Sequence, residues 1–337
     1  MAEAPASILV YVGLDAVGDG LMKLPFLRAL RSAFPAARIT WMAGKGHTVY
    51  AGSLAALVGG LVDEVLDQAG VGSRMGELLG RRPLAGRSFD LIIDTQRRLL
   101  TSLILRRVRH GRFISAAANF ALSDARPPAG WTRPAAMVGQ LMALVEMASG
   151  QPARADAPLP SDPAIERLAD GLLPPGLVYV GFAPGAGGRH KCWPLDRYVA
   201  LAARQQELGR VPVFLLGPNE ADWATDIRAA LPRAVLPLQE LDKAPPALTI
   251  ALARRMTAAV ANDSGTGHML AAADAPLVSL FGPTPPEKFA PAARRLAVVR
   301  AQDFGGDAMD LISLDAVAQA LEGLLRGGDR VASPALL

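Results

Sequence analysis

The sequence is poor in cysteine and in long apolar runs, and both absences exclude classes of protein. Its 337 residues include one cysteine, Cys192, so an internal disulfide and a multi-cysteine metal site are excluded. No run approaches the roughly 18 apolar residues that a membrane-spanning helix needs. The apolar stretch at residues 8–12 is too short for the core of a signal peptide. We therefore expect a cytoplasmic protein.

Several well-defined catalytic and nucleotide-binding motifs are also missing. No Gly-x-Gly-x-x-Gly follows the first expected strand, which argues against a nicotinamide-dependent oxidoreductase. The sequence has no P-loop, no His-Glu-x-x-His and no Gly-x-Ser-x-Gly around Ser264, so the enzyme classes built on those motifs are not expected. A net charge of +4 is modest for a nucleic-acid-binding protein, and no nucleic-acid partner is expected.

The composition that remains is typical of a globular α/β protein. Hydrophobic residues make up 51% and charged residues 20% of the chain, and its length is about twice that of a common single domain. Short β-rich runs alternate with helical patterns in both halves, which predicts two parallel sheets covered by helices. Prolines are frequent at residues 124–175 and indicate a spacer. We predict two domains, residues 1–165 and 166–337.

A first candidate site follows the strand expected at residues 8–12. Gly18-Asp19-Gly20 lies there, before a helical stripe of leucines, and ligands of open parallel sheets bind where strands end. Pro25 is predicted either to kink this helix or to set its start near Leu24. The Asp19 side chain could point into a binding cleft or cap the helix, and its position alone favours the cap.

A second candidate site is the glycine-rich segment at residues 183–194, Ala-Pro-Gly-Ala-Gly-Gly-Arg-His-Lys-Cys-Trp-Pro. It follows an expected strand and precedes an expected helix. Glycines expose backbone N–H groups to anions, and Arg189 and Lys191 add positive charge. The alternative interpretation is a flexible surface loop with solvated charges.

A third candidate site is the segment at residues 261–268, Ala-Asn-Asp-Ser-Gly-Thr-Gly-His, at the start of an expected helix. Backbone N–H groups and the helix dipole make such a start an anion site. The Ser264 and Thr266 hydroxyls could donate to phosphate, and His268 could face the same anion. Alternatively, Asp263 is a helix cap and His268 a core residue.

Six arginines lie within sixteen residues after the strand expected at Asp90–Asp94. Such a cluster attracts phosphates or an anionic membrane surface, or it forms a solvated helix face. Both interpretations stay open for this group, which comprises Arg97, Arg98, Arg106, Arg107, Arg109 and Arg112.

Taken in order, these segments resemble glycosyltransferase family 9, the bacterial lipopolysaccharide heptosyltransferases. The similarity extends from Ile8 to about Pro291. Its anchors are Gly18-Asp19 with Leu24-Pro25, Lys191-x-Trp193-Pro194, and Asn262-Asp263-Ser264-Gly265-x-x-His268 followed by Phe281-Gly282-Pro283-Thr284. The resemblance implies the GT-B architecture, in which two Rossmann-like α/β/α domains face each other across a cleft. The first domain then binds the acceptor and the second binds the nucleotide sugar.

The resemblance also implies roles for individual residues. Asp19 matches the catalytic base, Lys191 matches the catalytic lysine that holds the donor phosphates, and Glu220 falls where the family contacts the ribose. The other donor-binding positions implied are Gly185, Arg189, Asp263, Ser264, Gly265 and His268. The acceptor-binding positions expected in the first domain are Gly18, Gln96, Arg97 and Arg98. Transfer in this family inverts the anomeric centre and uses neither a metal nor another cofactor.

Departures from the family pattern leave the donor open. Gly13 stands where the family often has a basic residue, and Ala186 and Gly187 stand where hydroxyl residues often precede the lysine. The expected donor is an ADP-heptose-like nucleotide sugar, and the alternatives are a UDP- or GDP-linked sugar. The expected acceptor is an anionic lipid-linked saccharide, reached by peripheral contact with the inner membrane. A non-catalytic nucleotide-sugar binding protein is the alternative of another class.

Overall fold

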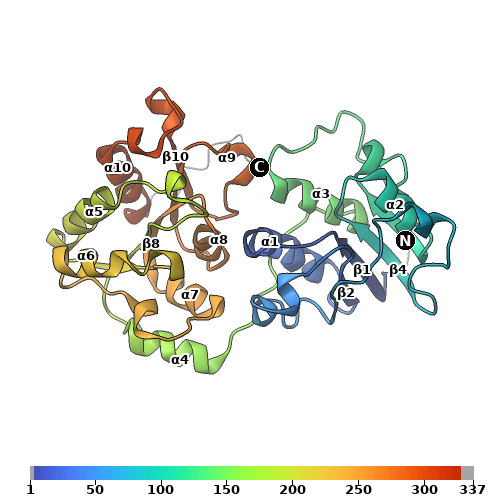
Figure 1. Cartoon of the computed structure of the whole chain (residues 1–337), viewed down its shortest axis with the longest axis horizontal. Helices are drawn as coiled ribbons and strands as arrows, with labels where there is room; N and C mark the ends of the chain where they lie inside the picture. The colour runs from blue at the N-terminus through green and yellow to red at the C-terminus, as the bar shows by residue number, and fades with distance from the viewer. Residues whose placement is uncertain (1–3, 328–337) are drawn as a thin grey trace. The chain divides into compact units, whose positions relative to one another are not determined.

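The computed structural model describes residues 4–327 and has two compact α/β units. The chain divides between Pro160 and Ser161 into unit 1 and unit 2, and Figure 1 labels many of their helices and strands. Each unit contains one five-stranded sheet, and every strand pair in both sheets is parallel. Within residues 4–327, none of the helices combines the length and the apolar character that crossing a membrane demands.

Unit 1 has the strand order β3-β2-β1-β4-β5. The strands are β1 (Ser7–Val12), β2 (Arg38–Ala43), β3 (Glu64–Leu66), β4 (Ser88–Asp94) and β5 (Arg109–Ser115). The α-helices are α1 (Val17–Ala33), α2 (Leu99–Leu105) and α3 (Met137–Ser149). Ile8 to Val12 are fully buried, as expected for a central parallel strand that is covered on both faces. Helices α1 and α3 pack together, and α2 adds Ile104 and Leu105 to the core around Leu9.

Unit 2 has the strand order β10-β9-β8-β6-β7. The strands are β6 (Tyr179–Ala183), β7 (Val211–Phe214), β8 (Met256–Asn262), β9 (Leu277–Phe281) and β10 (Leu296–Arg300). The α-helices are α4 (Pro163–Leu172), α5 (Leu195–Glu207), α6 (Trp223–Ala230), α7 (Pro246–Ala253), α8 (Gly265–Ala272), α9 (Pro286–Phe289) and α10 (Leu314–Leu325). Helices α5, α6 and α10 contribute to one core cluster and α4, α7 and α8 to another (Figure 1). This is an α/β/α sandwich.

Both sheets have one point at which the chain changes direction across the sheet. In unit 1 the chain runs from β1 outward through β2 and β3, then returns to β4 on the other side of β1. In unit 2 it runs from β6 to β7, then crosses to β8 on the other side of β6. Ligands of open parallel sheets bind beyond the carboxyl ends of the strands at such a switch point. The two candidate ligand-binding positions are therefore the carboxyl ends of β1/β4 and of β6/β8.

The α/β architecture predicted from the sequence is confirmed, and one helix boundary is corrected. Helix α1 begins at Val17 and continues through Pro25, so the predicted start near Leu24 is wrong. A proline inside a helix removes one backbone hydrogen bond. Complete burial of Leu24, Phe26 and Leu27 offsets that loss, because each buried apolar side chain contributes about 1.5–3 kcal/mol.

Candidate active site

In unit 2, one buried side chain joins the loops that follow β6 and β8. The Asn262 side-chain nitrogen donates to the Pro184 carbonyl over 2.7 Å. The Asn262 side-chain oxygen accepts from the backbone N–H of Trp193 over 3.2 Å. The Tyr198 hydroxyl donates to the same oxygen over 3.1 Å. Asn262 is fully buried. The glycine-rich loop and the start of α8 are therefore held side by side at the β6/β8 switch point.

A lysine and an aspartate meet at this switch point. Lys191 ends a short 3-10 helix, η5 (Arg189–Lys191), and its Nζ lies 3.6 Å from Asp263 Oδ2. The same Oδ2 accepts a 2.7 Å hydrogen bond from the Thr284 hydroxyl, in the loop after β9. The Lys191 side chain is 29% exposed. It is thus fixed beside the strand ends while one side stays accessible to an anion.

The start of α8 adds backbone donors to this place. Ser264 is the N-cap, and its hydroxyl accepts from the Gly267 N–H over 3.3 Å. His268 lies one turn inside and is 7% exposed. Burial lowers the pKa of His268, although the neighbouring Asp263 carboxylate opposes the shift. His268 is therefore neutral at neutral pH and can offer one ring nitrogen as donor and the other as acceptor.

Glu220 lies against the glycine-rich loop and explains one of its glycines. It ends the 3-10 helix η6 (Pro218–Glu220), which follows β7. A Cβ atom on Gly185 would lie 2.6 Å from the Glu220 carboxyl carbon, and one on Gly217 would lie 2.8 Å from Oε2. Burial raises the pKa of the Glu220 carboxyl. Gly185 therefore makes room for a carboxyl group, a role that the sequence pattern did not suggest.

Arg189 is bound within unit 2. Its guanidinium donates to Asp222 over 2.9 Å and to the Asn219 carbonyl over 3.2 Å. It also stacks over the Trp223 ring, 4.1 Å from the centroid. Arg189 fastens the glycine-rich loop to the start of α6, so we expect its contribution to anion binding to be indirect.

In unit 1, Asp19 both caps a helix and remains exposed. It is the third residue of α1, and its Oδ2 accepts from the Ala16 N–H over 3.2 Å. Lys23, one turn further along α1, does not neutralise Asp19 because its ammonium pairs with the buried Asp15. Asp15 also accepts from the Thr48 hydroxyl over 2.8 Å. The sequence analysis did not single out Asp15. The only signal for Asp15 in the sequence is an acidic residue shortly after an apolar strand.

The loop after β4 lies beside the loop after β1. A Cβ atom on Gly13 would lie 3.4 Å from the Gln96 side-chain oxygen, which places Gln96 at the β1/β4 switch point. Arg97 and Arg98 are exposed, and their guanidinium groups make no ion pair or hydrogen bond within residues 4–327. These two cations are available to an anionic ligand.

A buried carboxyl group supports this loop from below. Asp94 Oδ1 accepts from the Gln96 N–H over 2.9 Å. Its Oδ2 accepts from the hydroxyls of Ser102 over 2.6 Å and Ser115 over 3.0 Å. Burial raises the pKa of Asp94 to about 6 in spite of these hydrogen bonds. The sequence analysis treated Asp94 only as the end of a strand.

The arginine cluster does not form one surface. Helix α2 ends at Leu105 and Arg109 begins β5, so the interpretation as a single solvated helix face is wrong. Arg106 binds Asp124 over 3.1 Å, Arg107 donates to the Gly80 carbonyl over 2.7 Å, and Arg112 donates to the Ala148 carbonyl over 3.0 Å. These three guanidinium groups fasten the fold of unit 1 and are not free ligands for phosphate.

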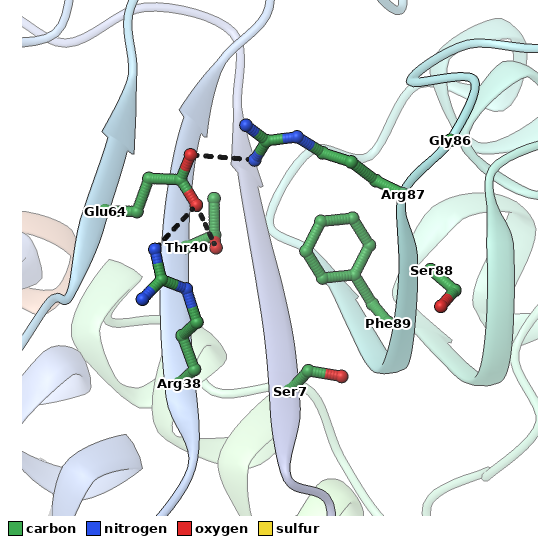
Figure 2. A pocket seen from close by; sticks show the side chains of 8 residues that line it. All are labelled: Ser7, Arg38, Thr40, Glu64, Gly86, Arg87, Ser88 and Phe89. Carbon is green, nitrogen blue, oxygen red and sulfur yellow. Dashed lines mark hydrogen bonds and ion pairs between the residues drawn. The ribbon is translucent and has the colours of Figure 1, made fainter.

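A pocket in unit 1 lies at the amino ends of the strands, whereas Asp19 follows the carboxyl end of β1. Figure 2 shows Glu64 between Arg38 and Arg87, with N–O distances of 3.4 and 2.8 Å. Ser7, Arg38 and Ser88 are the first residues of β1, β2 and β4. The hydrogen bond from Arg87 is the largest of the interactions that lower the pKa of Glu64. The charged groups of this pocket satisfy one another, and we assign it no part in the active site. Its lining residues are Ser7, Arg38, Thr40, Glu64, Gly86, Arg87, Ser88 and Phe89.

Two Rossmann-like units with candidate residues at their switch points form the GT-B architecture of glycosyltransferases. The family model of glycosyltransferase family 9 (heptosyltransferase) matches residues 79–308. The chain belongs to this family and is a glycosyltransferase.

Individual relatives agree with this assignment. The chain is 30% identical over 293 residues to lipopolysaccharide heptosyltransferase 1 of Pseudomonas aeruginosa, covering 82% of this chain and 79% of that protein. It is 32% identical over 129 residues to lipooligosaccharide heptosyltransferase 2 of Haemophilus influenzae, and this match spans only 36% of each chain. The solved structure of E. coli heptosyltransferase WaaC with ADP has a TM-score of 0.65 and 19% identity, with 94% of this chain and 99% of that chain covered. That likeness shows the fold.

Proposed function

We propose that this chain transfers a heptose from an ADP-heptose-like donor to a lipopolysaccharide core or a related surface saccharide. The observation that carries the proposal is the Lys191–Asp263 pair beside the start of α8, at the β6/β8 switch point. The relatives that are lipopolysaccharide or lipooligosaccharide heptosyltransferases support the sugar and the acceptor, and the ADP in the similar E. coli structure supports the nucleotide.

The donor is assigned to unit 2, within the predicted domain at residues 166–337. Lys191 and the N–H groups at the start of α8 bind the diphosphate, since a fixed cation and a helix N-terminus both attract phosphate. Glu220 accepts from the ribose hydroxyls, and Gly185 leaves room for its carboxyl group. The remaining donor contacts proposed are Arg189, acting indirectly, and Asp263, Ser264, Gly265 and His268.

The acceptor is assigned to unit 1, within the predicted domain at residues 1–165. Gly18, Gln96, Arg97 and Arg98 lie beside the β1/β4 switch point or in the first turn of α1. The guanidinium groups of Arg97 and Arg98, which have no ion pair within residues 4–327, suit an anionic, lipid-linked saccharide. We place the enzyme in the cytoplasm, at the cytoplasmic face of the inner membrane.

The transfer is proposed to be a single displacement that inverts the anomeric carbon. Asp19 removes the proton from the acceptor hydroxyl while the acceptor oxygen bonds to that carbon, and the bond to the nucleoside diphosphate breaks. Lys191 and the start of α8 stabilise the negative charge that develops on the diphosphate. This assignment uses no metal ion, because these protein groups supply the positive charge.

A comparison of nucleotides tests the donor. We expect ADP to raise the melting temperature more than UDP or GDP, and Lys191→Gln to remove most of that shift. Arg167→Gln is the control, because it removes one exposed positive charge from α4. A shift with UDP or GDP alone would contradict the ADP donor. Binding without acceptor-dependent release of nucleoside diphosphate would identify a nucleotide-sugar binding protein instead of a transferase.

A further inference from the structure

Unit 1 exposes apolar side chains next to its acceptor loop. Met75 is 67% exposed, Leu79 94%, Leu99 51% and Leu103 37%. Scattered exposed leucines are common, but apolar residues that gather on neighbouring segments mark interaction surfaces. These four residues, with the exposed Arg74, Arg81, Arg82, Arg97 and Arg98, are called the apolar–basic surface below.

Helix α2 presents two apolar faces. Its inner residues Ile104 and Leu105 are fully buried. Leu99 and Leu103, which are four residues apart and so on one face of the helix, point outward and are exposed. The core of unit 1 covers the inner face, whereas the outer leucines stay partly exposed among residues 4–327.

The segment that carries Met75 and Leu79 is fixed beside α2. It contains the 3-10 helix η3 (Met75–Leu78), which packs against α2. The Thr101 hydroxyl donates to the Gly72 carbonyl over 2.8 Å, and Arg107 donates to the Glu77 and Gly80 carbonyls. The apolar side chains of both segments therefore belong to one built surface.

The charge around these residues is of one sign. Residues 72–112 include ten arginines and three acidic residues. The Glu77 carboxylate accepts from three backbone N–H groups, those of Gly72, Ser73 and Arg74. Asp94 is buried and Asp90 accepts from Ser7 at the opposite edge of the sheet. Among the ion pairs of residues 4–327, none involves Arg81, Arg82, Arg97 or Arg98.

We propose that the apolar–basic surface docks unit 1 onto an anionic phospholipid bilayer. Interfacial segments insert apolar side chains at the boundary between headgroups and acyl chains, and nearby arginines bind the lipid phosphates. The excess of arginine fits that surface better than it fits a mixed-charge protein surface, because the three acids of this segment are buried, bound by backbone N–H groups or at the other end of the strands. Arg97 and Arg98 immediately precede α2, so docking would bring a lipid-linked acceptor to this loop. Only this last step rests on the proposed function.

Vesicle co-sedimentation tests the docking with paired variants. Arg81→Gln with Arg82→Gln should lower partitioning onto phosphatidylglycerol-containing vesicles about 30-fold, since each arginine near such a surface contributes roughly a fivefold factor. Met75→Ser with Leu79→Ser should lower it at least about tenfold.

The matched controls lie in unit 2 and should stay within about twofold of the parent. They are Arg167→Gln with Arg233→Gln, and Leu177→Ser with Leu208→Ser, whose leucines are 58% and 59% exposed.

Three results would overturn the docking. These are absence of binding to anionic vesicles, equal binding to vesicles of phosphatidylcholine alone, and equal losses in the test and control variants. Self-association that Met75→Ser with Leu79→Ser abolishes, without vesicle binding by the parent, would assign the surface to a second copy instead. We expect the variants to keep the melting temperature of the parent, because all substituted residues are exposed. Unchanged melting temperatures would show that lost vesicle binding is not due to unfolding.

A lipid-free saccharide acceptor separates this proposal from the proposed function. With such an acceptor, the Arg81/Arg82 and Met75/Leu79 variants should release nucleoside diphosphate at the parent rate. Lost vesicle binding with unchanged release supports docking. Parent protein that binds anionic vesicles but never releases nucleoside diphosphate contradicts the proposed transfer and leaves the docking intact.

Discussion

Both units contain a five-stranded parallel sheet with one switch point, but they hold their candidate residues in different ways. In unit 2 the residues are connected to each other: Asn262 joins two loops, and Lys191 pairs with Asp263. In unit 1, Asp19, Arg97 and Arg98 are exposed and not connected to one another. Groups that are fixed before the ligand arrives cost no reorganisation when charge develops. This difference suits the proposed binding of one compact anion by unit 2 and of a large ligand by unit 1.

In unit 1 the fixed groups are buried residues that support the exposed candidate residues. Asp15 pairs with Lys23 and Asp94 holds the backbone of Gln96. These buried carboxyl groups set the directions of the loops that present Asp19 and the two arginines. The comparison therefore predicts large effects on catalysis from the exposed residues, and effects on stability from the buried ones.

The largest effect is expected from Asp19→Asn. It should slow transfer about 10²- to 10⁴-fold, since that is the usual contribution of a general base. The amide oxygen of asparagine can still accept the hydrogen bond from the Ala16 N–H, so α1 should keep its start and the donor its affinity. Nucleoside diphosphate release and calorimetric titration with ADP measure the two effects.

Asp315→Asn is the control for this variant, because Asp315 is an exposed acid in the first turn of α10. It should leave transfer unchanged. Full turnover by Asp19→Asn would leave Asp19 with its capping role alone.

The buried support of unit 1 can be tested through pH. Burial raises the pKa of Asp94 to about 6 from 3.8, so the folded state binds this proton more tightly than the unfolded state does. The resulting stabilisation is complete below pH 4 and is lost as the pH rises through 6. Relative to Asp94→Asn, the parent should lose roughly 3 kcal/mol of unfolding free energy between pH 4 and 7. Chemical denaturation at several pH values measures this difference, and a constant difference would contradict the prediction.

The sequence was sufficient for the architecture and for the residues at strand ends. The strands expected at residues 8–12 and 90–94 lie within β1 and β4, because buried parallel strands are rich in apolar residues. Strand β5 was missed because Arg109 and Arg112 interrupt its pattern. The exposure of Arg109 on this edge strand and the contact of Arg112 with α3 are tertiary facts.

Contacts between distant residues could not be predicted in the same way. The sequence predicted that Gly185 exposes its backbone N–H to an anion, but it did not predict that the Glu220 carboxyl lies against it. Arg189 appeared to be a free cation, but Trp223 and Asp222 hold it. A sequence pattern lists which chemical groups are present, and the fold decides which of them are already occupied.

Two neighbouring cations of η5 separate direct from indirect donor binding. Lys191→Gln should weaken ADP binding about 30-fold, within the range for loss of a charge-assisted hydrogen bond. Arg189→Gln should weaken it only about threefold, because surface ion pairs contribute little and its effect passes through the loop. Calorimetric titration of both variants measures the contrast. Equal losses would show that Arg189 contacts the phosphates directly.

An effect smaller than that of Lys191→Gln tests how closely the donor site is packed. Gly185→Ala introduces a Cβ atom 2.6 Å from the Glu220 carboxyl carbon, so Glu220 or the loop must move. Overpacking of this kind costs typically 1–3 kcal/mol, and we expect ADP to bind about tenfold more weakly.

Gly187→Ala in the same loop is the matched control. A Cβ atom there meets nothing within 4 Å, and ADP affinity should not change. Comparing both variants with ADP and with inorganic diphosphate locates the effect. If Glu220 contacts the ribose, the Gly185→Ala loss should appear with ADP and disappear with diphosphate, which has no ribose. An equal loss with both ligands would instead mean that the substitution displaces Lys191, and that Glu220 is a structural residue of the loop.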